Sequence, residues 1–137
     1  MNTVINRLQA VLSSPEDYTI LDGDRYESER RRLSSLLGLG LGDSASPSPT
    51  ASVDLASESL ESIADHLRSL PVPTDGQVLV LWPYARVGAW MRMKALLETL
   101  DELWLPGGDD VWVTDAAHEW LIVLDHEERL SFYAPHR

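Results

Sequence analysis

The stretch from Asp101 to Glu128 combines strong acidity with large apolar side chains. It holds nine Asp and Glu residues and no Lys or Arg, yet three of the five tryptophans of the chain lie in it. Its segment WLIVL is an unbroken apolar run. A disordered acidic tail lacks such residues, because it has too little apolar surface to offset the entropy of ordering. The stretch is therefore predicted to be folded, as strands joined by acidic turns.

Period-two alternation predicts an antiparallel sheet in the C-terminal half of the chain. The expected strands are VLVLW at 78–82, GAWMRM at 88–93, VWVTD at 111–115, WLIVLD at 120–125 and LSFYA at 130–134. Residues 87–93 also continue into helical spacing, so strand and helix both stay open for that segment. In the strand 120–125, Trp120, Ile122 and Leu124 share one face, and Leu121 and Val123 share the other. This strand is predicted to be covered on both sides.

Helical spacing of apolar residues predicts amphipathic helices, mainly in the N-terminal half. They are expected from about 4 to 13, 24 to 37, 53 to 70 and 94 to 103. Asp24 and Glu27 have the spacing of a capping box at the second helix. Residues 38–52, GLGLGDSASPSPTAS, are predicted to be a flexible loop rich in Gly, Ser and Pro. We expect one domain over residues 1–137, an α+β fold with the N-terminal helices packed on an antiparallel sheet of about four to five strands.

Composition excludes several classes of function. The formal net charge is -11 with a pI near 4.6, which disfavours nucleic acid and anionic membranes as partners and favours a basic protein. There is no cysteine, so neither a disulfide nor a thiolate metal site can form. We expect no cofactor. No apolar run approaches the ~20 residues that span a bilayer, and the expected location is the cytoplasm.

The acidic residues of the C-terminal meander are predicted to separate into two groups. In an antiparallel hairpin, the start of the strand at 111 lies beside the end of the strand at 124, which brings Asp109 and Asp110 toward Asp125, His126 and Glu127. His118 belongs to the opposite turn, because a strand of this length separates it from His126 by roughly 20 Å. One alternative is a divalent-metal site formed by Asp109, Asp110, Asp125 and His126, but the spacing matches no metal-binding motif, and ordinary turn chemistry is preferred.

The other interpretation of these residues is a surface that binds a partner. Its candidate contacts are Asp109, Asp110, Asp115, Glu119, Asp125, Glu127 and Glu128, with Trp104 and Trp112 as aromatic anchors provided that they are exposed. No Gly-x-Ser-x-Gly or His-Glu-x-x-His pattern supports a hydrolase. Catalytic residues are therefore not assigned.

Two segments, PEDYTIL at 15–21 and DDVWVTDAAHEWLIVLDHEERLSFY at 109–133, are similar to pieces of small acidic bacterial proteins that act as immunity partners of toxins. The SUKH superfamily is among the proteins that the chain resembles. The resemblance implies an α+β binding protein that neutralises a toxin by occupying it. It implies no catalytic residues.

Three functions follow as hypotheses. The first is a non-enzymatic, acidic protein-binding module, an immunity protein or antitoxin that neutralises a basic toxin or nuclease. The second is a small metal-dependent hydrolase that uses the Asp/His cluster. The third is an accessory subunit of a larger assembly.

Overall fold

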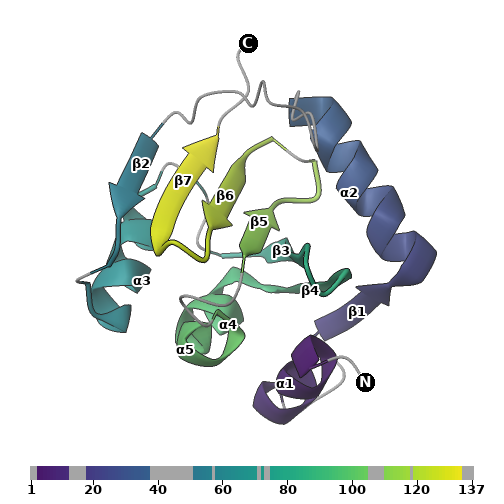
Figure 1. Ribbon diagram of the computed structural model, residues 1–137, viewed down its shortest axis with the longest axis horizontal. Coiled ribbons are helices and arrows are strands. Elements are labelled where there is room, and N and C mark those ends of the chain that lie inside the picture. The colour runs from purple at the N-terminus through teal and green to yellow at the C-terminus, as the bar shows by residue number, and fades with distance from the viewer. Residues whose placement is uncertain are drawn as a thin grey trace.

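The computed structural model describes residues 3–12, 18–37, 51–56, 58–70, 72, 75–104, 110–117 and 119–133. Within them the chain forms a seven-stranded antiparallel sheet with strand order β1-β4-β3-β5-β6-β7-β2 (Figure 1). The strands are β1 (Tyr18–Asp22), β2 (Ala51–Asp54), β3 (Gln77–Trp82), β4 (Val87–Arg92), β5 (Val111–Thr114), β6 (Leu121–Leu124) and β7 (Arg129–Tyr133). Segments from both halves of the chain therefore contribute to one sheet.

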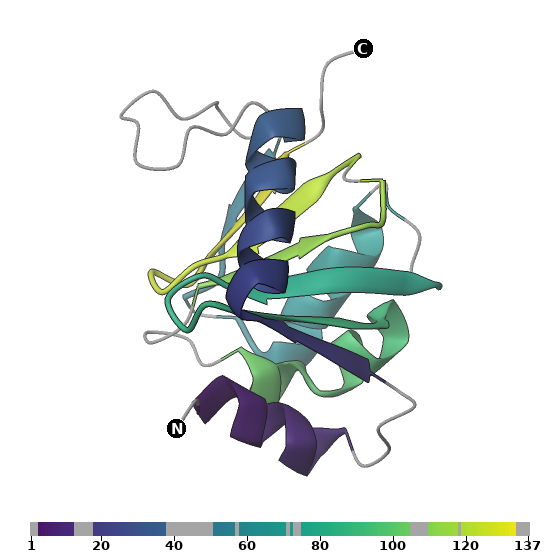
Figure 2. The ribbon, with the colours of Figure 1, turned by 90° about the vertical axis from the view of Figure 1, so that its right-hand side faces the viewer.

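Helices cover the two faces of the sheet unequally. They are α1 (Thr3–Val11), α2 (Gly23–Leu37), α3 (Leu60–Ser69), α4 (Met93–Glu98) and α5 (Leu100–Leu103). Residues of α1, α3, α4 and α5 share the larger apolar core with one face, whereas α2 packs into a smaller core on the other face. Figure 2 shows α2 lying across the front of the sheet. The molecule is an α+β structure of three layers, with the sheet in the middle.

A glycine allows α2 to approach the sheet closely. A Cβ atom added to Gly88 of β4 would lie 2.6 Å from Leu81 Cδ2 and 3.8 Å from Tyr26 Cδ1. The missing side chain thus leaves room for Leu81 on β3 and for the ring of Tyr26, which is buried at the start of α2.

Most of the predicted elements are confirmed. The spans 78–82, 111–115, 120–125 and 130–134 correspond to β3, β5, β6 and β7. The segment left open at 87–93 is the strand β4 up to Arg92, and Met93 begins α4. The two-sided burial of β6 is also confirmed, since Trp120, Ile122 and Leu124 lie in the larger core, while Leu121 and Val123 contact the smaller one. Central strands have apolar residues on both faces, which explains why the sequence of β4 fitted both the spacing of a strand and that of a helix.

The sheet has more strands than the sequence predicted, and two elements differ. Residues 18–22 were not expected to be a strand, yet β1 pairs with β4 along its whole length. Residues 51–54 pair with β7 as β2, so the expected helix from 53 to 70 and the expected loop to 52 are both wrong at these positions. The helix starts at Leu60 because the side chain of Ser59 caps it by accepting from the Ser62 N–H. Residues 38–50 of the expected loop lie outside the described part of the chain.

The expected single helix from 94 to 103 is interrupted at Thr99. Its Oγ1 donates to the carbonyl of Ala95 at 2.6 Å, and its backbone leaves the helical region at φ -120° and ψ 19°. A threonine hydroxyl competes with the helical backbone bonds in this way. In the described part of the chain, no helix combines the length and apolar character needed to cross a membrane.

Candidate functional site: an acidic end of the sheet

The strand register brings five separate segments to one end of the sheet. We call this the tyrosine end. It comprises the β1–α2 junction at 22–23, the end of β2 at 54–55, the β3–β4 turn at 83–86, Asp110 and the β6–β7 turn at 125–128. These segments are brought together by the pairings Asp22↔Val87, Trp82↔Val87, Leu81↔Trp112, Val111↔Leu124 and Asp54↔Arg129. In Figure 2 the turns 83–86 and 125–128 project side by side from this end.

Asp110 and His126 form the polar centre of the tyrosine end. Asp110 Oδ1 accepts from the backbone N–H of His126 at 2.8 Å and lies 2.9 Å from its Nδ1. The hydrogen bond and the charge of Asp110 raise the pKa of the His126 imidazole above its ordinary value. The predicted approach of these two residues is confirmed. Asp109 lies outside the described residues.

The β6–β7 turn is organised by its first acidic residue. Asp125 Oδ1 accepts from the N–H groups of Glu127 and Arg129 at 2.9 and 3.0 Å. Glu128 has a φ of 60°, and its carbonyl accepts from the N–H of Leu55 at 2.7 Å, which ties the turn to the end of β2. Asp125 therefore shapes the backbone, while the exposed side chain of Glu127 is available to a partner.

Tyr84 is the exposed aromatic residue of this end. It is 74% exposed, and no other large hydrophobic residue of the described chain is exposed. Its ring meets the imidazole of His126 edge-on, with centroids 6.4 Å apart and planes at 65°. Tyr84 was not among the contact residues expected from the sequence, although a Pro-Tyr pair in a hairpin turn was a usable signal.

Beside Tyr84, Arg86 links the turn to α2. Arg86 donates to Glu27 Oε1 from Nε at 3.1 Å and from a terminal nitrogen at 2.7 Å, and Arg30 reaches Glu27 Oε2 at 3.2 Å. Hydrogen bonding by Arg86 is the main cause of the lowered pKa of Glu27. These contacts fix the position of the turn that presents Tyr84.

Asp115 and Glu119 lie at the opposite end of the sheet, the far end. Asp115 Oδ1 accepts from the Glu119 N–H at 2.9 Å, and the turn connects Thr114 with Leu121, which pair across β5 and β6. His118 lies outside the described residues. The predicted separation of the acidic residues into two groups is therefore confirmed for the described ones.

The two candidate tryptophan anchors differ in their surroundings. Trp104 is 0% exposed and packs in the larger core, so it fails the condition of exposure and offers no surface to a partner. The indole ring of Trp104, which directly follows α5, is part of the hydrophobic core. Trp112 is partly buried and packs against the smaller core on the α2 face. Neither lies beside Tyr84 as an exposed ring.

A metal site is not formed by the described residues. Among them no group of three or more His, Asp or Glu side chains is arranged to hold an ion. Asp110 and His126 bind each other, and the Asp125 Oδ1 atom is directed at backbone N–H groups. The hypothetical set with Asp109, Asp110, Asp125 and His126 has one member outside the described chain.

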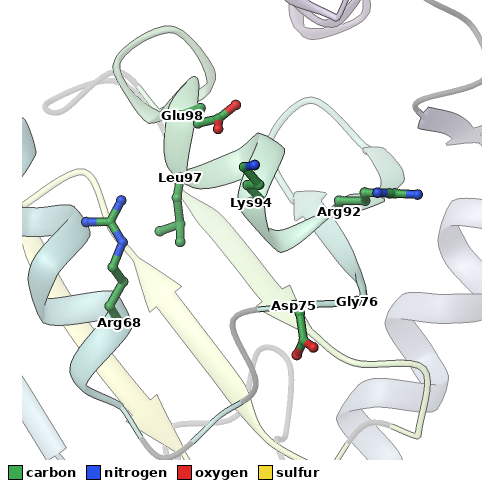
Figure 3. A pocket seen from close by; sticks show the side chains of 7 residues that line it. All are labelled: Arg68, Asp75, Gly76, Arg92, Lys94, Leu97 and Glu98. Atoms are coloured by element: carbon green, nitrogen blue, oxygen red, sulfur yellow. The ribbon is translucent and has the colours of Figure 1, made fainter.

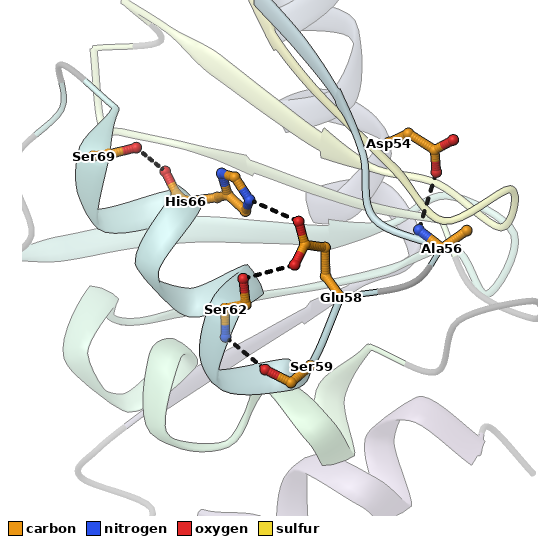
Figure 4. Close-up of polar contacts among 7 residues, drawn as sticks. All are labelled: Asp54, Ala56, Glu58, Ser59, Ser62, His66 and Ser69. Carbon is orange, nitrogen blue, oxygen red and sulfur yellow. Dashed lines mark hydrogen bonds and ion pairs between the residues drawn. The ribbon is translucent and has the colours of Figure 1, made fainter.

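A second contact between a histidine and a carboxylate lies at the start of α3 (Figure 4). Glu58 Oε2 accepts from the Ser62 hydroxyl at 2.8 Å, and Oε1 lies 3.4 Å from His66 Nε2. The Ser62 hydrogen bond is the main cause of the lowered pKa of Glu58. In a nucleophilic triad the hydroxyl would contact the imidazole, but here it donates to the carboxylate. The arrangement stabilises the start of a helix and carries no sign of catalysis.

Comparisons with family models, with curated proteins and with solved structures each found no match to this chain.

Proposed function

We propose that the protein is a non-enzymatic binding protein that docks a basic protein through the tyrosine end of the sheet. The exposure of Tyr84 beside the Asp110–His126 pair is the observation that carries this proposal. Tyrosine is enriched among residues that dominate binding energy, because it offers a large rigid surface and a polar tip. The exposed ring of Tyr84 is thus free to pack against a partner, beside a polar pair that can orient it.

The charge around Tyr84 supports a basic partner. Asp110 lies just before β5, Glu127 and Glu128 belong to the β6–β7 turn, and the whole chain carries a net charge of -11. Such a field accelerates encounter with a positively charged surface and repels acidic proteins. A toxin or nuclease neutralised by an immunity protein or antitoxin is the partner class that we propose, in line with the sequence resemblance.

Binding kinetics test the proposal. The protein encoded by the gene adjacent to this one is the first candidate partner, and its association rate should fall by about tenfold between low and physiological salt. Tyr84→Ala should weaken the complex by about tenfold or more, mainly through faster dissociation. Glu127→Lys should slow association, because Glu127 is exposed and its side chain does not hold the turn.

Glu119→Lys is the matched control for Glu127→Lys, since it makes the same charge change at the far end. If Tyr84→Ala and Glu119→Lys have equal effects, or if the association rate does not depend on salt, the tyrosine end is not the docking surface. Asp110 and Asp125 are unsuitable for the first test, because their substitution would also disturb the turn.

A further inference from the structure

A groove runs along α3 and the α4–α5 pair on the face of the sheet opposite α2. It consists of three hollows of about 390, 380 and 200 Å³. Arg68, Leu97 and Glu98 line both the first and the middle hollow, and Asp101 lines both the middle and the third. The shared residues place the three hollows in a row, and we call this row the groove.

The groove has an apolar floor. Ala64 and Leu100 lie under the middle hollow, and Ile63 lies under the third. All three are largely buried, so their positions are fixed by the core beneath them. Figure 3 shows the first hollow, where Leu97 stands between Arg68 and Lys94, while Arg92 reaches away from it. A partner segment would meet a preformed surface with little ordering cost.

The charge lining the groove becomes more negative from the first hollow to the third. Three cationic and two carboxylate side chains line the first hollow, including Lys94, the only lysine of the chain. One cation and three carboxylates line the middle hollow. Three carboxylates, Glu58, Asp101 and Glu128, line the third, where no described Lys or Arg contributes. The exposed Arg68–Asp65 pair, at 3.0 Å, adds little to this gradient because exposed pairs are well solvated.

The third hollow joins the groove to the tyrosine end. Glu128 lines it and also belongs to the β6–β7 turn, where its carbonyl binds the N–H of Leu55, another lining residue. A partner docked on Tyr84 is therefore within reach of the carboxylate half of the groove.

We propose that the groove binds a linear segment of the partner protein whose charges are separated along its length. Its Lys or Arg side chains face Glu58, Asp101 and Glu128, its apolar side chains lie on the floor, and its acidic end or terminal carboxylate lies near Lys94. The gradient fixes the direction of the segment, since the reverse orientation places like charges together. This inference rests on the proposed function, because it gives the basic partner a second contact.

Peptide selection tests the groove without knowledge of the partner. A display library of random peptides with free carboxyl ends is selected on the full-length protein, and enriched peptides are measured by fluorescence anisotropy. Enriched sequences should carry basic residues in one half and acidic residues or the free carboxylate in the other. Asp101→Lys should lower their affinity by about tenfold. Lys94→Glu should weaken them by a smaller factor, because Arg68 stays in place.

Glu102→Lys is the matched control, since it makes the same change one position further along α5, on a residue that lines none of the three hollows. Its effect should stay within about twofold, and thermal unfolding should show that both variants fold. Asp101→Asn removes the carboxylate without adding a positive charge. If it lowers peptide affinity as much as Asp101→Lys does, the loss comes from the missing carboxylate and not from repulsion by the new lysine.

Three results would overturn the groove proposal: no enrichment, enriched peptides without charge separation, or equal loss with Asp101→Lys and Glu102→Lys. Self-association that Asp101→Lys abolishes would do so too, since the occupant would then be a second copy of the chain. The same variants are then measured with a full-length partner. If Tyr84→Ala weakens that complex and Asp101→Lys does not, the groove proposal fails and the proposed function stands. If neither change matters, both fail.

Discussion

The two ends of the sheet use the same turn chemistry but differ in what they collect. At each end an aspartate opens the turn and accepts from backbone N–H groups, Asp115 from Glu119 at the far end and Asp125 from Glu127 and Arg129 at the tyrosine end. The tyrosine end also holds the β3–β4 turn, whereas the same register places the starts of β1, β2 and β3 and the end of β4 at the far end. It presents an exposed aromatic ring, which the far end does not show among its described residues.

This difference shows that topology concentrates the candidate surface more than local sequence does. DAAHE and DHEE are similar acidic turns in the sequence, and only the pairing of distant strands distinguishes them. The following predictions compare the two ends, starting with the largest expected effect.

Replacing Trp82 should have the largest effect on stability. Trp82 is 2% exposed, and its Nε1 donates to the Leu103 carbonyl at 2.9 Å, which anchors the tyrosine end to α5. We expect Trp82→Ala to lower the free energy of unfolding by about 3–5 kcal/mol, measured by urea denaturation. Trp82→Phe should cost about 1–3 kcal/mol, because the ring remains but the carbonyl loses its donor. Equal costs for the two would show that the hydrogen bond is the main anchor.

Thr114 is the corresponding anchor near the far end. It is buried, and its hydroxyl donates to the Trp120 carbonyl at 2.6 Å. Thr114→Val keeps the shape and removes the donor, so we expect a loss of about 1–3 kcal/mol in the same measurement. Thr114→Ser, which keeps the hydroxyl, is the control. A more stable valine variant would contradict the role of this hydrogen bond.

The two turn aspartates should differ in importance. Asp125 accepts from two N–H groups and Asp115 from one in the contacts that define each turn. We expect Asp125→Ala to cost about 1–2 kcal/mol and Asp115→Ala about half of that, since exposed N–H groups regain water. Thermal unfolding of the two variants measures this. The reverse ranking would show that the far-end turn is the more rigid one.

The smallest effect concerns pH at the tyrosine end. Asp110 raises the pKa of His126, so the protonated imidazole stabilises the folded turn. This stabilisation is fully present below the unfolded pKa and is lost as the pH rises through the folded pKa. Asp110→Asn should move the pKa of His126 down, toward its ordinary value, in an NMR titration of the ring protons. An unchanged pKa would show that the ion pair does not form in solution.

Sequence patterns predicted the interior of the fold better than its edges. β3, β5 and β6 are central, and their apolar residues on both faces make them recognisable. β1 and β2 form the two edges, and the described side chains of β2 are mostly exposed, so their strand character depends on pairing with β4 and β7. Edge strands of this kind are selected by tertiary contacts more than by intrinsic preference.

The candidate site was predicted only where one hairpin determines it. Asp110 and His126 are neighbours across β5 and β6, a pairing that follows from the order of two adjacent strands. Tyr84 reaches His126 through the pairing of β3 with β5, and Arg86 reaches Glu27 across 59 positions of the chain. Contacts of this second kind depend on the strand order, which no local pattern contains.

The pairing of the edge strands also has a kinetic consequence. β1 meets β4, and β2 meets β7, each across a long span of the chain, whereas β3–β4, β5–β6 and β6–β7 are formed between adjacent segments. Distant pairings carry the larger loop-closure cost and therefore form late. We expect amide hydrogens of β1 and β2 to exchange sooner than those of β5 and β6. A molecule that opens in this way exposes the unpaired sides of β4 and β7, which can then pair with strands of other chains.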